Sequence, residues 1–275
     1  MKTFRTMLKT EIKLSVRGMD MVIFGLCLPV AMVVILGAVS GNRPAFEGAS
    51  YTFFEQSFGA LSTIAICAGG VMGLPLLISD YRQKKILKRF QVTPVSPALI
   101  LAVHVAIYAI YALGSLVLVY GTSAVFFGFR MQGSAAAFIL SYLLVMLSMF
   151  SIGLAAGGLA PDTKTAGIIA SILYFPMLIF SGATLPYEIM PVPMQKAAGL
   201  MPLTQGIKLL KAAALGQPTD QVWLPVLILG AVFILCCGIA LRFFRWEEGR
   251  TRPHPPMKSI RLNCSPSRLS SNSWM

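Results

Sequence analysis

Charged residues are scarce in this sequence. They make up 12% of its 275 residues, about half the share found in an ordinary soluble domain. Hydrophobic residues make up 56%, the mean hydropathy is +0.74, and the apolar residues come in long blocks. This composition excludes a water-soluble globule, a disordered chain and a nucleic-acid-binding module. Six blocks of roughly 20 residues would use about 120 residues, which leaves no room for a separate soluble catalytic domain.

The sequence also lacks the motifs of common enzymes. It contains no G-x-S-x-G, no H-E-x-x-H and no G-x-x-x-x-G-K-[ST], and no pair of carboxylates lies within an apolar block. We therefore expect no catalytic, no cofactor-binding and no metal-ligating residue, and we do not expect an enzyme. Because the chain has no phosphate-binding loop for ATP, the energy for any uphill transport must come from another polypeptide.

Titratable groups are nearly absent from the apolar blocks. His104 is the single candidate inside one, and a lone histidine is more often a hydrogen-bonded structural residue than a proton relay. Proton or sodium coupling needs ionisable side chains within the membrane, so a gradient-driven carrier is disfavoured, although it stays an alternative beside a non-transporting scaffold. The cysteines show no metal-ligand spacing: Cys27, Cys67, Cys236, Cys237 and Cys264.

Six apolar runs have the length of membrane helices. They predict an all-α integral membrane protein within residues 1–246. Proline lies well inside three of the runs, at Pro29, Pro75 and Pro176, and is tolerated because neighbouring helices satisfy the freed carbonyls. Gly153 and Gly157 form a small-xxx-small pair that permits close helix contact. The predicted spans are 21–40, about 57–79, about 98–127, about 134–159, about 165–181 and 222–241.

The segments that flank the spans are basic. In residues 1–20, five cations alternate with apolar residues, which predicts an amphipathic helix in the membrane interface or, alternatively, a plain positive flank. Residues 247–275 are rich in Pro, Ser and Arg and are expected to form a disordered basic tail. Of all Lys and Arg, 18 fall on the side of the two termini and five on the other side, so both termini are expected in the cytoplasm.

The loop between the second and third spans carries a short amphipathic pattern. Ile86, Leu87 and Phe90 share one face of a helix, and cations flank that face. Pro94 ends the pattern because proline disfavours helix at the preceding residue. The loop is either a docking helix, whose apolar face fills a groove rimmed by carboxylates on a soluble partner, or a basic topogenic loop near anionic lipid.

Residues 180–216, on the predicted external side, are too apolar for a free loop and too broken by proline for a span. Backbone of this kind near membrane depth is tolerated only where protein buries it or where it lines a cavity. We therefore expect short re-entrant or interfacial helices that cap the external side.

Two stretches of sequence carry distinctive motifs. The first is Tyr174–Pro186, followed by Met190-Pro191 and Met201-Pro202-Leu203-Thr204. The second is Leu87–Ser96. Both resemble the type-2 ABC transporter permeases, the membrane subunits of drug, antibiotic and polysaccharide exporters, and the second is similar to the coupling region of that family. The resemblance covers about residues 1–246. Residues 80–85 depart from the acidic, glycine-containing stretch that the family often has there, which bears on the contacts with the partner.

The resemblance implies a permease subunit of an ATP-driven exporter in the plasma (inner) membrane. Two copies, or one copy and a paralogous permease, would form the path for a drug, an antibiotic or another amphipathic compound. Separate cytoplasmic ATPase subunits would use ATP and Mg²⁺, while this chain binds no cofactor. The open alternatives are a secondary efflux carrier and a scaffold or immunity subunit.

The resemblance also assigns roles to residues. Residues that dock the ATPase would be Lys85, Ile86, Leu87, Lys88, Arg89, Phe90, Thr93 and Pro94. An external gate would be built from Phe180, Ser181, Gly182, Pro186, Pro191, Pro202 and Thr204. The second and fifth spans would lie near the dimer axis. By their composition alone, the aromatic and methionine residues of these spans would suit an amphipathic or hydrophobic cargo, but ordinary helix packing is the favoured interpretation: Phe58, Met72, Tyr174, Phe175 and Met177.

Overall fold

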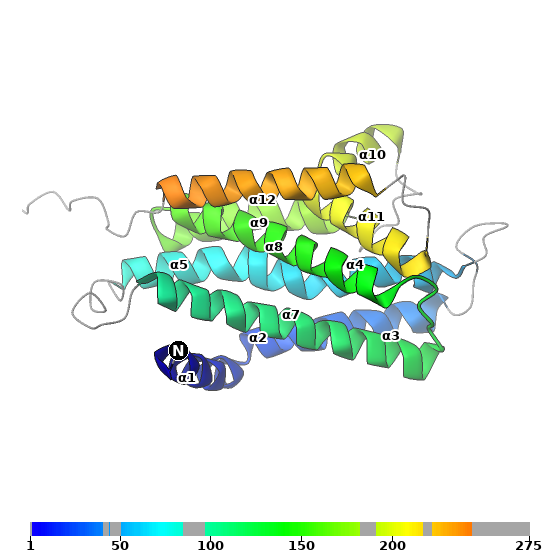
Figure 1. The fold of residues 1–275 in the computed structure, drawn as a ribbon, viewed down its shortest axis with the longest axis horizontal. Helices are drawn as coiled ribbons and strands as arrows, with labels where there is room; N and C mark the ends of the chain where they lie inside the picture. Colours follow the sequence, from blue (N-terminus) through cyan, green and yellow to red (C-terminus); the bar gives the residue numbers. More distant parts are fainter. Residues whose placement is uncertain are drawn as a thin grey trace, which may run out of the picture.

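The computed structural model describes residues 2–40, 44, 51–84, 97–181, 191–216 and 222–243. Regular elements in these ranges are all helical (Figure 1), which confirms the predicted all-α class for the described residues. The elements are α1 (Lys2–Gly18), α2 (Asp20–Val22), η1 (Ile23–Cys27), α3 (Leu28–Ser40), α4 (Phe53–Cys67), η2 (Ala68–Gly73), α5 (Leu74–Gln83), α7 (Pro97–Phe127), α8 (Ala135–Leu159), α9 (Thr163–Phe180), α10 (Val192–Gly199), α11 (Pro202–Leu215) and α12 (Trp223–Phe243).

Five helices among the described residues are long and apolar enough to cross a membrane. A sixth crossing is reached if Phe4–Gly18 and Ile23–Val39, which meet at 80°, are counted as one bent span. The upper count equals the six predicted spans. The five are Phe53–Gln83, Leu99–Phe127, Ala135–Leu159, Thr163–Phe180 and Trp223–Ala240.

The second span is longer than the predicted 57–79. It begins at Phe53 because Thr52 and Glu55 form a capping box: the Glu55 N–H donates to Thr52 Oγ1 at 3.2 Å, and the Thr52 N–H donates to Glu55 Oε2 at 2.7 Å. This pairing satisfies two backbone donors that have no partner within the helix. At its other end the helix continues to Gln83, because polar side chains there bond to neighbouring helices.

Two π-helical turns precede prolines inside spans. Segment η1 ends two residues before Pro29, and η2 ends two residues before Pro75. Proline has no N–H to donate, and its ring clashes with the carbonyl four residues earlier. The wider π turn accommodates that carbonyl, so both helices continue past the proline instead of breaking.

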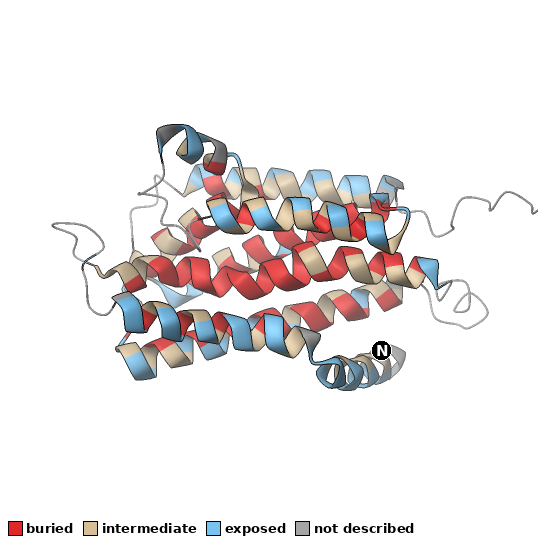
Figure 2. Ribbon diagram, turned by 180° about the vertical axis from the view of Figure 1, so that it is seen from behind, coloured by how far each residue is buried: buried red, intermediate tan, exposed pale blue. Residues whose placement is uncertain are grey.

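The second span, α4–η2–α5, lies in the middle of the bundle. Of the most apolar 18 residues of this span, 83% are buried inside the chain, whereas the corresponding shares are 17% for α9 and 11% for α12. Figure 2 shows it as a nearly continuous buried helix, with the other helices arranged around it. Because α9 and α12 leave most of their apolar surface uncovered, these helices need lipid or another protein around them.

The predicted small-residue contact is present between α8 and the second span. A Cβ atom added at Gly153 would lie 1.9 Å from the carbonyl oxygen of Gly70 in η2. A Cβ atom at Gly157 would lie 2.8 Å from Ile78 Cδ1. Only glycine allows the backbones to come this close, so this pair fixes how α8 crosses η2 and α5.

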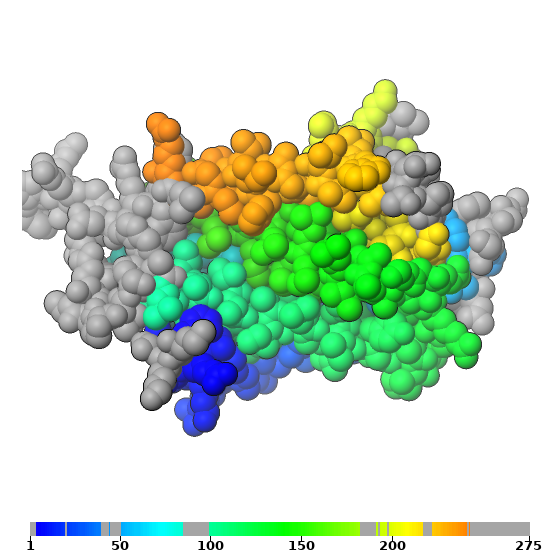
Figure 3. Space-filling view, in the orientation of Figure 1, coloured from blue at the N-terminus to red at the C-terminus, as the bar shows by residue number. Residues whose placement is uncertain are grey.

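The basic segments gather at one end of the bundle. The N-terminal helix α1, the last turn of α5 and the C-terminal end of α12 lie there, and α10 lies at the opposite end (Figure 1). Helix α1 rests on the first part of α7 (Figure 3), through apolar contacts of Phe4, Met7, Leu8 and Ile12. The predicted tail, 247–275, lies outside the described residues.

Candidate functional site

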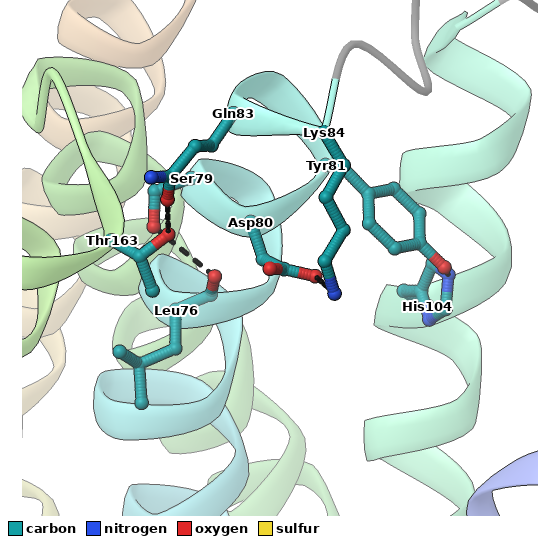
Figure 4. A network of polar contacts seen from close by, with 8 residues as sticks. All are labelled: Leu76, Ser79, Asp80, Tyr81, Gln83, Lys84, His104 and Thr163. Carbon is teal, nitrogen blue, oxygen red and sulfur yellow. Dashed lines mark hydrogen bonds and ion pairs between the residues drawn. The ribbon is translucent and has the colours of Figure 1, made fainter.

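The predicted docking residues, 85–90 with Thr93 and Pro94, lie outside the described residues. The structure instead describes the last turn of α5, directly before them. Four consecutive side chains of this turn, Asp80 to Gln83, have polar partners, three of them on other parts of the chain. Figure 4 shows Asp80, Tyr81 and Gln83 with theirs. This turn is therefore the part of the candidate coupling site whose geometry is known.

Arg82 ties α5 to the end of α8. Its guanidinium donates through Nη1 to the carbonyl oxygen of Ala160 at 2.7 Å and through Nη2 to that of Gly157 at 3.0 Å. The last carbonyls of a helix have no partner within it, and a cation is favourable at that end of the helix dipole. Although Arg82 is charged, it is buried, so this contact is a structural anchor and not a solvated surface charge.

Tyr81 and Gln83 tie the same turn to two more helices. The Tyr81 hydroxyl lies 2.8 Å from His104 Nε2 on α7, and the two rings meet edge to face at 5.1 Å. The Thr163 hydroxyl, at the start of α9, donates to Gln83 Oε1 at 2.6 Å. Figure 4 shows these side chains reaching from α5 toward both neighbours. Consequently, the end of α5 is held to α7, α8 and α9 together.

The start of α9 is capped by Asp162. Its carboxylate accepts a hydrogen bond from the Thr165 N–H at 2.7 Å. Hydrogen bonds from the Thr165 side chain and backbone lower the pKa of the Asp162 carboxyl. An ionised cap is favourable here because the helix N-terminus carries partial positive charge. Asp162 therefore fixes α9 beside the Gln83–Thr163 contact.

Five of the predicted gate residues are described: Phe180, Ser181, Pro191, Pro202 and Thr204; Gly182 and Pro186 lie outside the described ranges. Thr204 Oγ1 lies 3.5 Å from the carbonyl oxygen of Phe180, so the end of α9 meets the start of α11. Helix α11 packs closely on α4 and α8: a Cβ at Gly59 would lie 3.2 Å from the Lys211 backbone nitrogen. Short helices between the fifth and sixth spans are present, as expected.

The predicted path residues are not gathered on one surface. Phe58 is fully enclosed and stacks on Phe129 with ring centroids 4.3 Å apart. Met177 is buried, Met72 and Tyr174 are half-buried, and Phe175 is 52% exposed. The surroundings of Phe58 favour the packing interpretation for that residue, whereas Phe175 lies on an outward face of α9.

The residues at the end of α5 were not among the predicted site residues. Tyr81, Arg82 and Gln83 stood out in the sequence only as a departure from the family pattern. A run of polar residues directly after an apolar span was the available signal, and it did not reveal the partners. Among the described residues, no three His, Cys, Asp or Glu side chains are grouped so as to hold a metal ion.

Comparison with known proteins gives one family. A family model described as "ABC-2 type transporter" matches residues 2–215. Nodulation protein J of Rhizobium leguminosarum bv. viciae is 32% identical over 97 residues, which cover 35% of this chain and 35% of the relative. Inner membrane transport permease YhhJ of Escherichia coli (strain K12) is 30% identical over 123 residues, or 44% of this chain and 33% of the relative. The aligned parts span about a third of the length of these relatives.

Proposed function

The chain belongs to the ABC-2 type transporter family, and we propose that it is the permease subunit of an ATP-driven exporter in the inner membrane. ABC-2 permeases pair with ATPase subunits in transporter complexes. The name of the Escherichia coli relative supports placement in the inner membrane. In this arrangement the basic end of the bundle is cytoplasmic, in keeping with the excess of Lys and Arg on that side.

The observation that carries the proposal is the anchoring of α5. Its last turn contacts α7, α8 and α9 through Tyr81, Arg82 and Gln83. The proposed ATPase-docking segment begins directly after this turn. A displacement of that segment by the ATPase would therefore move α5 and its three neighbours together. The four helices would switch as one packed unit between two conformations. Gly182 and Pro186, with Phe180 and Thr204, would form the gate at the opposite end.

The docking face is tested by adding charge to it. Leu87→Asp combined with Phe90→Asp should leave the chain inserted in the membrane but abolish stable association with the ATPase subunit, because two carboxylates cannot enter an apolar groove. The control pair, Leu87→Met with Phe90→Leu, keeps the face apolar and should retain the complex. Co-purification of the ATPase measures both. Retention of the complex by the double-Asp variant would contradict the docking proposal.

We further propose that the exporter is a dimer whose subunits meet along α9. Ile168, Ile172, Phe175 and Ile179 are exposed on this helix and recur at steps of four, three and four residues, which places them on one stripe. A second copy would cover this stripe, and the substrate path would run beside it. The enclosed position of α4 leaves that helix little surface for either role.

Disulfide cross-linking in native membranes distinguishes the α9 interface from other helix faces. In a background without native cysteines, Phe175→Cys should cross-link two copies, because the stripe faces its own symmetry mate. Leu235→Cys, which is 65% exposed on α12, is the matched control and should stay monomeric on a denaturing gel. Equal cross-linking at the two positions, or cross-linking at 235 alone, would refute the α9 interface.

A further inference from the structure

A cavity of about 250 Å³ lies between α1, α5 and α7 at the basic end of the bundle. Its polar lining comes from three separate segments. Glu11 and Ser15 come from α1, Tyr81 comes from α5, and His104 and Tyr108 come from α7. The space is on the order of eight water molecules at about 30 Å³ each, which is sufficient for a small polar headgroup.

Glu11 is in an unusual position for an interfacial helix. It is the single acidic residue in Lys2–Gly18. The cations Arg5, Lys9 and Lys13 are exposed, as expected for the polar face. Glu11 is instead half-buried, on the face that packs against α7, and burial raises the pKa of its carboxyl. Among the described residues, no hydrogen bond or ion pair satisfies it.

A half-buried carboxylate is costly unless a positive group pairs with it. Aromatic rings beside the carboxylate favour an ammonium ligand, because the face of a ring attracts a cation. Tyr81 and Tyr108 supply such rings on the walls of this cavity. The Glu11 carboxylate in the same lining accepts hydrogen bonds, so the cavity matches a small ammonium group that carries N–H donors.

The depth of the cavity points to the headgroup layer. Helix α1 meets the next helix at 80°, so it runs across the bundle direction at the end of the spans, where an interfacial helix lies. We propose that this cavity binds the primary ammonium group of an ethanolamine headgroup, with Glu11 as its counter-ion. A phospholipid supplies this group from the membrane, and free ethanolamine supplies the same group from solution.

Native mass spectrometry of the full-length chain tests the proposal. The chain is purified with equal amounts of ethanolamine and choline phospholipids that carry the same acyl chains. Wild type should retain the ethanolamine lipid several-fold over the choline lipid, because the quaternary choline nitrogen has no N–H to donate. Glu11→Gln, which keeps the shape of the side chain, should bring the ratio close to one. Asp80→Asn removes a carboxylate at the same end but outside the cavity lining and should keep the wild-type ratio.

Two further arms complete the experiment. With wild type alone, lipids bearing one, two or three methyl groups on the ethanolamine nitrogen should be retained progressively less. Free ethanolamine that displaces the lipid at millimolar concentration would assign a soluble source, and failure to displace would assign the lipid. No headgroup preference in wild type, or an unchanged preference in Glu11→Gln, would overturn the proposal. The assay involves neither ATPase nor transport, so its failure would leave the proposed function standing.

Discussion

At the scale of single residues, Gly153 makes the sharpest prediction. Gly153→Ala should lower the thermal midpoint of the purified chain, because the new Cβ would meet the Gly70 carbonyl oxygen at 1.9 Å. Forcing atoms into a packed contact costs about 1–3 kcal/mol. Gly230→Ala is the control, since a Cβ there meets nothing within 4 Å. Fluorescence-detected size-exclusion chromatography after heating measures both, and equal midpoints would contradict the close contact.

Arg82 makes a second prediction at this scale. Arg82→Met should lower the thermal midpoint strongly, because hydrogen bonds to a charged group contribute about 1.5–3 kcal/mol each and two carbonyl oxygens lose their donor. The thermal midpoint of Arg82→Lys should lie between those of wild type and Arg82→Met, because an ammonium group cannot donate to both carbonyl oxygens with the geometry of a guanidinium. Lys84→Met, at a side chain that is 64% exposed, is the control. A midpoint for Arg82→Met that matches this control would show that Arg82 anchors nothing.

At the scale of elements, the cap of α9 predicts a pH dependence. The pKa of Asp162 is lowered in the folded chain, so the folded state favours the ionised carboxylate. The resulting stability is present above the ordinary pKa of an aspartate and is lost as pH falls through the folded value. At neutral pH, the thermal midpoint of wild type should be higher than that of Asp162→Asn, whose side chain can still cap the helix but carries no charge. That difference should vanish in acid, and a difference that persists there would contradict the assignment.

Sequence patterns predicted the elements better than their contacts. The lengths of the apolar runs predicted the ends of five long helices to within a few residues. The apolar side of the pattern in α1 is the side that packs against α7. The start of α4 at Phe53 could also have been predicted, because Thr52 and Glu55 have the spacing of a capping box. In contrast, Arg82 bonds to a carbonyl 78 residues away, and Tyr81 lies beside a histidine 23 residues away. Such pairings depend on how the helices pack, which no local pattern contains.

At the scale of the whole molecule, the two ends of the bundle carry different structural features. One end carries α1, the anchored turn of α5 and the Glu11 cavity, and the other carries α10. The enclosed second span connects the two ends. We therefore expect force applied at residues 85–96 to reach the opposite end through α5, η2 and α4, which form one continuous helix.

Whether the chain works with separate ATPase subunits is tested by the mass of the complex extracted from native membranes. We expect two copies of a permease, at least one of them this 29.7 kDa chain, bound to two subunits that carry the ATP-binding loop absent from its sequence. Native mass spectrometry under mild detergent resolves that composition. A chain recovered without any nucleotide-hydrolysing partner, from membranes whose export activity is intact, would contradict the claim.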